Sequence, residues 1–296
     1  MSHTFSVAAP KPPDYKKLMK ALPFDDVLPE GDQEEPTRGP WPEGIRHYYR
    51  DGLSTRGAEV SWEDKVFAVR INTLAAPEDY DLAMHFIEQA AKLLKVPIDP
   101  EGGETIPADQ LRDEYDTEWV RQTNEVGLAT VGALIAGDDH DSIQLGGVIR
   151  SVHIGPRVWG ELTKAGPKGK MLDRLVEFMR RVQYVNAEED YFAANVMTLN
   201  RQNKGKGKGK DKDKEVTVAA FGPGVRYLFP SVEYLVVVGQ EEGDPILFVP
   251  SKKLPELLKS YEWEWLDEEQ TLVEPVPEAE WGKFRKRAQK LSVPAP

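Results

Sequence analysis

The sequence predicts a mixed α+β fold, in which antiparallel-rich sheets carry amphipathic helices and follow a proline-rich extended N-terminal arm. Three observations support this prediction. Short runs of β-branched residues alternate with Gly- and Pro-containing turns, which is typical of antiparallel strands. Other segments repeat apolar residues at helical spacing. Eight of the 23 prolines fall within residues 1–42, where each fixes φ and removes a backbone donor.

The 296 residues suffice for one large domain or for two of ordinary size. We expect the arm over residues 1–42, with a short helical turn around residues 15–22. An α/β part follows over residues 43–186, and a β-rich part over residues 187–296. The last two parts are also compatible with a single domain.

The α/β part is expected to place strands beside amphipathic helices. Residues 66–71 are rich in β-branched side chains and predict a strand. Proline followed by two acids at residues 77–79 is typical of a helix start, and Pro97 ends that helix. Further on we expect a helix from Pro107 through Trp119, followed up to Ile135 by a Gly-interrupted span that is helix, strand or both. A turn over 137–141 then leads into a strand or hairpin over 143–154. The last expected element of this part is an amphipathic helix over 171–179.

The β-rich part contains a Lys/Gly loop over residues 201–215, which we expect to join two antiparallel strands because its lysine run offers nothing apolar to bury. The expected elements are strands at 191–199, 215–221, 232–238 and 246–249, a short helix over 254–258 and one more strand drawn from 263–265 and 271–273. A terminal helix beginning at residue 277 sets Trp281, Phe284, Ala288 and Leu291 on one face.

The charge of the chain favours a basic partner. Lys and Arg total 38 against 50 Asp and Glu, a net charge of −12. Residues 201–215 hold seven basic and three acidic side chains, so the remainder carries −16. A field of this sign repels nucleic acid and attracts basic proteins, although it also serves simply to keep a protein soluble. We therefore expect a basic protein partner and no nucleic acid.

The missing signals point to a cytoplasmic protein. No apolar run approaches a membrane span, no secretory signal opens the chain, and there is no cysteine. Phosphate-binding loops, zincin helices and nucleophile elbows are also missing from the sequence. We therefore expect no membrane association and no cofactor, and we assign no catalytic residue.

One cluster of residues could hold a divalent cation. Asp138, Asp139, His140 and Asp141 supply carboxylate and imidazole ligands, and His153 would join them if the chain folds back. Adjacent side chains in a turn usually diverge, however, so a plain solvated turn is the alternative interpretation.

A second candidate site combines aromatic and acidic residues. Trp263 and Trp265 precede Asp267, Glu268 and Glu269. Tryptophan is favoured at binding hot spots, and acids steer basic partners. The same alternation is expected of an edge strand lying over a core, so both interpretations stay open.

Three functions fit these features. We favour a non-catalytic acidic protein that inhibits or sequesters a basic protein partner, for example a bacterial immunity-type protein. A metal-assisted hydrolase using the cluster at 138–141 is the second. The third is a structural component of a larger assembly, docked through the N-terminal arm and the lysine-rich loop.

Overall fold

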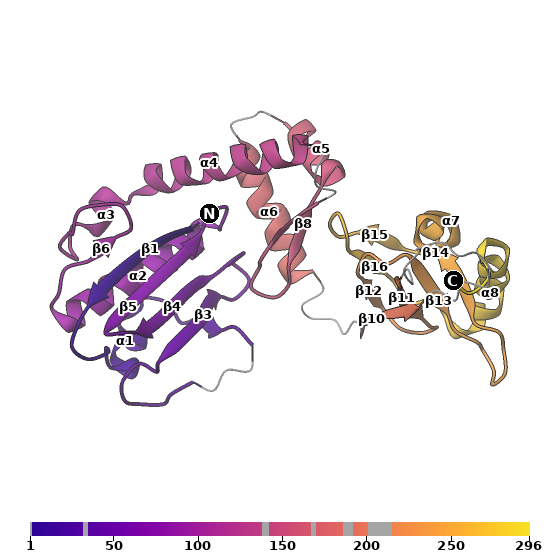
Figure 1. The fold of residues 1–296 in the computed structure, drawn as a ribbon, viewed down its shortest axis with the longest axis horizontal. Helices are drawn as coiled ribbons and strands as arrows, with labels where there is room; N and C mark the ends of the chain where they lie inside the picture. Colours follow the sequence, from indigo (N-terminus) through magenta and orange to yellow (C-terminus); the bar gives the residue numbers. More distant parts are fainter. Residues whose placement is uncertain (1, 32–34, 138–141, 167–169, 186–191, 201–214) are drawn as a thin grey trace, which may run out of the picture. The chain divides into compact units, whose positions relative to one another are not determined.

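The computed structural model describes residues 2–31, 35–137, 142–166, 170–185, 192–200 and 215–296. It divides into two compact units, Met1–Val185 and Asn186–Pro296. Both units combine helices with largely antiparallel sheets, which confirms the predicted fold class (Figure 1). No helix in the described ranges is both long enough and apolar enough to cross a membrane.

The first unit is built on a six-stranded sheet in the order β2-β3-β4-β5-β1-β6, with every neighbouring pair antiparallel. Its strands are β1 (Ser2–Ala8), β2 (Val27–Pro29), β3 (Gly44–Arg50), β4 (Ala58–Glu63), β5 (Val66–Asn72) and β6 (Asp99–Pro100). Alternate residues of β5, namely Phe67, Val69 and Ile71, are buried, as expected when one face of a strand lies on a core. Helix α2 (Pro77–Leu94) lies along the sheet and belongs to the same core (Figure 1).

Residues 1–42 do not form the predicted extended arm. β1 lies inside the sheet between β5 and β6, with Phe5 and Val7 fully buried. The expected helical turn is confirmed as α1 (Tyr15–Ala21), and Trp41 is buried in the same core. Most of the prolines lie in the connections, and Pro29 lies on the short strand β2 at the sheet edge, where a missing N–H is tolerated.

The remaining elements of the first unit follow the sheet in sequence. They are α3 (Leu111–Glu114), α4 (Thr117–Ala136), the hairpin strands β7 (Ile143–Leu145) and β8 (Val152–Ile154), α5 (Pro156–Lys164) and α6 (Met171–Tyr184). The helix expected from Pro107 through Trp119 is interrupted at Tyr115, because Asp116 begins a new helix by accepting a hydrogen bond from the Trp119 N–H at 2.9 Å.

Gly127 and Gly132, which left the element type up to Ile135 undecided in the sequence, both lie within helix α4. A Cβ atom on Gly127 would approach Leu74 to 3.0 Å, and one on Gly132 would approach the Trp159 ring to 2.8 Å. At each of these two positions a neighbouring side chain occupies the space that a Cβ atom would need, which favours glycine. The indole of Trp159 has a packing role, since it rests against Gly132.

The second unit contains two four-stranded sheets around one aromatic core. The first is β10 (Val196–Asn200), β11 (Glu215–Phe221), β13 (Tyr234–Val237) and β14 (Leu247–Pro250), and the second is β15 (Trp263–Trp265), β16 (Thr271–Val273), β12 (Tyr227–Phe229) and β9 (Phe192–Ala193). The expected antiparallel pairing across residues 201–214 is confirmed for β10 and β11. Residues 263–265 and 271–273 are two paired strands rather than one.

Two helices and a 3-10 turn complete this unit. They are η2 (Ser251–Lys253), α7 (Leu254–Leu257) and α8 (Glu278–Leu291). The predicted apolar face of α8 is confirmed: Trp281, Phe284 and Ala288 are fully buried. The Phe221 ring lies edge-on to both Trp281 and Phe284, with centroids 5.7 and 5.2 Å away.

Candidate functional site

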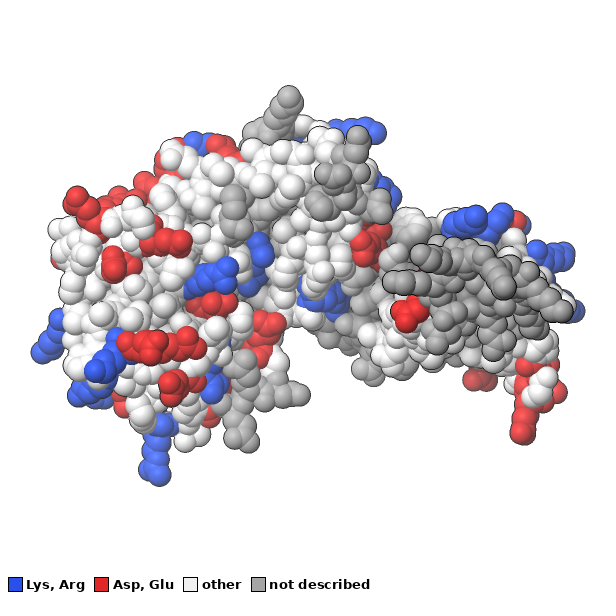
Figure 2. Space-filling view, viewed as in Figure 1, with Lys and Arg blue, Asp and Glu red and all other residues white. Residues whose placement is uncertain are grey.

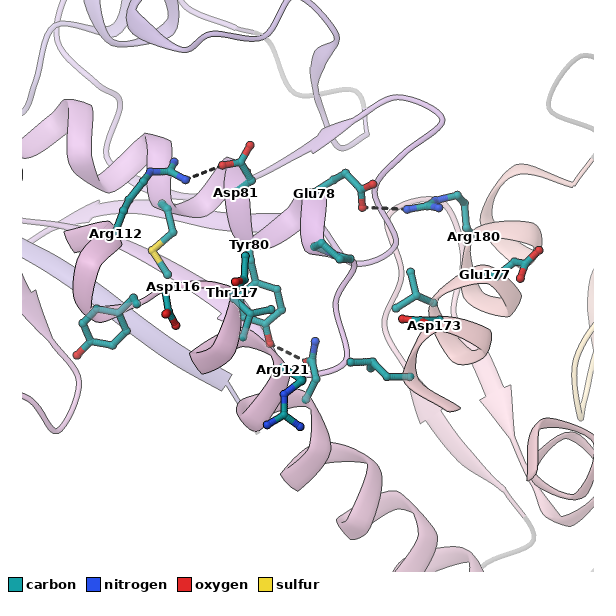
Figure 3. Close-up of a pocket in the computed structure, with 17 residues that line it drawn as sticks. Glu78, Tyr80, Asp81, Arg112, Asp116, Thr117, Arg121, Asp173, Glu177 and Arg180 are labelled. Atoms are coloured by element: carbon teal, nitrogen blue, oxygen red, sulfur yellow. Dashed lines mark hydrogen bonds and ion pairs between the residues drawn. The ribbon is translucent and has the colours of Figure 1, made fainter. Parts of the chain in front are cut away.

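A groove of about 840 Å³ lies in the first unit between α2, the first half of α4 with the residues just before it, and α6 (Figure 3). Its apolar lining comes from Pro77, Tyr80, Met84, Tyr115, Val120, Leu172 and Val176. Its charged lining consists of five acids and three arginines, namely Glu78, Asp81, Asp116, Asp173, Glu177, Arg112, Arg121 and Arg180. Binding sites usually combine an apolar surface with charged and polar groups, and this groove has both, with an unusually large charged share.

The start of α2 is fixed by the buried carboxylate of Asp79. Its Oδ2 atom accepts hydrogen bonds from the N–H groups of Thr55, Arg56 and Ala76 at 2.9–3.1 Å, and from the Thr55 hydroxyl at 3.1 Å. This carboxylate joins the loop after β3 to the first turn of the helix. Glu78 and Asp81, the groove acids on α2, are thereby held in place.

The floor of the groove joins α2 to α4 through a buried amide. Asn124 of α4 accepts hydrogen bonds from the Tyr80 hydroxyl at 2.8 Å and from the Leu74 N–H at 2.7 Å. Burial raises the pKa of Tyr80, so this phenol stays protonated and donates. The two helices are therefore held at a fixed spacing at this point.

Each groove arginine is already bound to acids. Arg112 donates to Asp81 at 2.7 Å, Arg180 donates to Glu78 at 2.9 Å (Figure 3), and Arg121 donates to Glu118 at 2.8 Å. The nearby His85 ring and then the Arg112 guanidinium lower the pKa of Asp81 to about 2. The positive charge of the groove is thus largely neutralised from within the molecule.

The acids on α6 are placed differently. Asp173 and Glu177 are exposed, and no cation of the described residues pairs with either carboxylate. Asp116 is exposed as well, with one oxygen used by the helix cap of α4. The charge left uncompensated along the groove is therefore negative, and this side suits a ligand with positive groups beside apolar ones.

The model of one family, the Domain of unknown function (DUF4299), matches residues 42–207, which is more than half of the 296-residue chain. The chain belongs to the DUF4299 family. The matched region contains every residue that lines the groove. No curated protein and no solved structure matches the chain.

The predicted metal cluster of this DUF4299 protein, Asp138, Asp139, His140 and Asp141, lies outside the described residues. His153 is described: it is half-buried on β8, where it is paired with Gln144 of β7. Among the residues that the structure describes, no three acid or histidine side chains are grouped to hold a metal ion.

The predicted aromatic and acidic patch lies on the edge strand β15 and the turn after it. Trp263 and Trp265 share one face, with ring centroids 5.5 Å apart, and Trp265 is 39% exposed. Asp267, however, is fully buried, and its carboxylate accepts hydrogen bonds from the N–H groups of Glu269 and Gln270 at 2.9 and 2.7 Å. It stabilises the turn and is not open to a partner.

For the other members of the patch, partner binding stays a prediction. Glu268 and Glu269 are half-buried.

The groove residues were missed by reasoning from the sequence. One signal was present: Asp173, Glu177 and Arg180 repeat at i, i+4 and i+7, which places them on one stripe of a predicted amphipathic helix. A polar stripe is also what any solvated helix face shows. Only the tertiary arrangement brings this stripe opposite Tyr80 and Met84 of α2.

Proposed function

We propose that this DUF4299 protein is a non-catalytic binding protein that holds a basic, amphipathic segment of a partner protein in the groove between α2, α4 and α6. One observation supports this above the others. The groove combines an apolar floor with unpaired acids on α6, while its three arginines are already occupied by neighbouring acids.

The two kinds of surface would contribute separately to binding. Apolar side chains of the partner would cover Met84, Val120 and Leu172, and burial of such surface contributes about 25 cal/mol per Å². Lysine or arginine side chains on the other face of the segment would approach Asp173 and Glu177. Charge complementarity of this kind speeds encounter and selects the partner, as in other helix-in-groove complexes.

The net charge of −12 adds a longer-range attraction for a basic partner. Inhibition of a basic toxin, as by a bacterial immunity protein that covers a cationic active site, is one concrete form of this activity. The alternative is a structural component docked through the N-terminal arm and the lysine-rich loop; it receives less support from the arm, because β1 is an internal strand of the sheet.

Capture from a native lysate with the full chain as bait tests this proposal. We expect a basic protein to be retained at low salt and released as salt rises toward ~0.5 M, since screening shortens the range of charge interactions. The double variant Asp173→Asn/Glu177→Gln should weaken the complex roughly fivefold, as expected for two exposed ion pairs. Leu172→Gln should weaken it at every salt concentration.

A matched control removes the same charge elsewhere. Glu241 and Glu242 are exposed in a turn of the second unit, so Glu241→Gln/Glu242→Gln should leave capture unchanged. Equal losses in the control and in the groove variant would contradict the groove as the binding site. A captured partner of acidic or neutral charge would contradict the proposed chemistry.

A further inference from the structure

The second unit carries a cationic cleft of about 350 Å³ between α7 and α8. Five basic side chains and one acid line it, namely Lys259, Lys283, Lys286, Arg287, Lys290 and Glu256, together with Leu291. Figure 2 shows lysine and arginine side chains gathered over α7 and α8. This concentration of positive charge occurs in a chain whose net charge is −12.

The sequence of α8 explains how the cations come together. Lys283, Lys286 and Lys290 follow at i, i+3 and i+7 and form one stripe of the helix. Trp281 and Phe284 face the core of the unit and fix the rotation of the helix. Burial of the apolar face therefore sets the lysine stripe against Lys259, which follows α7.

One cation of the cleft is held firmly. The Arg287 guanidinium donates through Nη1 to the Leu257 carbonyl at 2.9 Å and through Nη2 to the Ser260 hydroxyl at 3.2 Å. Its Cζ atom also lies 5.7 Å from the centre of the Tyr261 ring. Arg287 consequently joins α7 to α8 and keeps a positive charge in the lining of the cleft without an acid partner in these contacts.

The charge of the cleft is not balanced within the unit. Its one acid, Glu256, pairs with Lys253 at 3.2 Å, a lysine that does not line the cleft. In the part of the chain that the structure describes, Lys259, Lys283, Lys286 and Lys290 form no ion pair. Four like charges so close together repel one another, and a bound anion would relieve that repulsion.

We propose that this cleft binds a compact oligophosphate anion, such as a free or nucleoside-linked di- or triphosphate. Lysine ammonium groups and a fixed guanidinium are the side chains that recognise phosphate oxygens. A volume of about 350 Å³ is at the small end of ligand sites and suits a compact anion. The negative charge of the rest of the chain disfavours a long nucleic-acid strand or an anionic membrane.

Isothermal titration of the full chain with tripolyphosphate and with pyrophosphate, at ~20 mM and ~150 mM NaCl, tests the proposal. We expect one saturable site that persists at the higher salt concentration. The triple variant Lys283→Gln/Lys286→Gln/Lys290→Gln should lose at least about tenfold in affinity. The charge-preserving Lys283→Arg/Lys286→Arg/Lys290→Arg variant should retain it, which also shows that these exposed positions tolerate substitution.

Two control variants distinguish specific anion binding in the cleft from non-specific attraction of the anion by lysines elsewhere in the chain. Lys16→Gln/Lys17→Gln/Lys20→Gln removes the same charge from three exposed positions of α1 and should leave affinity unchanged. Replacing the lysines between residues 204 and 214 by Gln should do the same. Equal losses in either control, loss of binding in the arginine variant, or binding at low salt only would overturn the proposal.

Parallel titrations with single-stranded RNA and with vesicles containing phosphatidylinositol bisphosphate distinguish the sources of phosphate. For a compact cleft we expect tripolyphosphate to bind more tightly, per phosphate group, than either the RNA or the vesicles. Preferential binding of RNA or of the vesicles, removed by the triple Gln variant, would overturn the small-anion assignment.

Discussion

The groove of the first unit and the cleft of the second present opposite charges. Five acids face three arginines in the groove, and these arginines are already paired, whereas five cations face one acid in the cleft. The units themselves are both acidic, with 22 basic against 31 acidic residues (−9) in the first and 16 against 19 (−3) in the second. The net charge of a unit therefore does not predict the charge of its recess. The sign of the charge in each recess depends on where the charged residues lie along single helices.

The recesses also differ in their relation to the family. The DUF4299 match at residues 42–207 includes the whole lining of the groove, whereas the residues of the cleft, 256–291, lie beyond it. Binding through the groove is thus a hypothesis about the family region. Binding through the cleft concerns the second unit of this chain.

The largest effects are expected from substitutions in the separate cores of the units. Phe86→Ala in the first unit and Phe284→Ala in the second each remove a fully buried ring and should lower the free energy of unfolding by about 3–5 kcal/mol. Hydrogen exchange should show the loss of protection in the substituted unit. Equal loss of protection in both units for both variants would contradict two separate cores.

The next effect concerns the buried carboxylate that supports the groove. Asp79→Ala leaves the N–H groups of Thr55 and Arg56 and the Thr55 hydroxyl without their acceptor, which should cost about 2–4 kcal/mol in denaturant unfolding. The Ala76 N–H keeps a second acceptor, the Thr55 hydroxyl oxygen at 2.9 Å. All four bonds end on Oδ2, and Oδ1 has no hydrogen-bond partner among the described residues. Asn retains one acceptor oxygen, so Asp79→Asn should cost less than half as much. Similar losses in the two variants would show that the carboxylate charge, rather than the acceptor, is needed.

The elements with a strong local period could be predicted from the sequence. The stripe of Trp281, Phe284 and Ala288 fixed both the type and the buried face of α8, because amphipathic spacing depends on neighbours in sequence alone. β1 was missed although Phe5 and Val7 alternate with polar residues. The density of prolines that follow it indicated an arm, while those prolines in fact mark the connections around a buried strand.

The candidate sites were harder to predict than the elements. A groove depends on which helices face one another in the fold. The sequence of α6 alone does not predict that Asp173 and Glu177 line the same groove as the apolar side chains of α2. Asp267 shows the converse error. An acid in a row of acids suggests a surface, yet this one is buried because its carboxylate accepts the N–H groups of its own turn.

A smaller effect is expected from the ion pair between Asp81 and Arg112 in the lining of the groove. His85 and then Arg112 hold the pKa of Asp81 at about 2, against an ordinary value of 3.8. Because this pKa is lowered on folding, the stabilisation is fully present above about pH 4 and is lost as the pH falls through 2. Arg112→Gln should raise the pKa and cost less than about 1 kcal/mol at pH 7, since both side chains are about 40% exposed.

Carboxyl NMR titration measures this change directly, and Arg112→Lys is the control that keeps the charge. His85→Asn should raise the pKa of Asp81 at least as far as Arg112→Gln does, since the contact with His85 has the larger influence. An unchanged pKa in both variants would show that neither side chain stabilises the ionised carboxylate.

The smallest effect is expected when the variants of one recess are tested on the ligand of the other. Asp173→Asn/Glu177→Gln changes the groove by two exposed charges and should alter tripolyphosphate affinity by less than about twofold at ~0.1 M salt, because salt screens the interactions of exposed charges. Lys283→Gln/Lys286→Gln/Lys290→Gln should likewise leave capture of a basic partner unchanged. A larger cross-effect that fades as salt rises would mean that the two recesses act through the summed field of the chain. A cross-effect that persists at high salt would instead indicate an energetic coupling between the two units, and would show that the opposite charges of groove and cleft belong to one binding event.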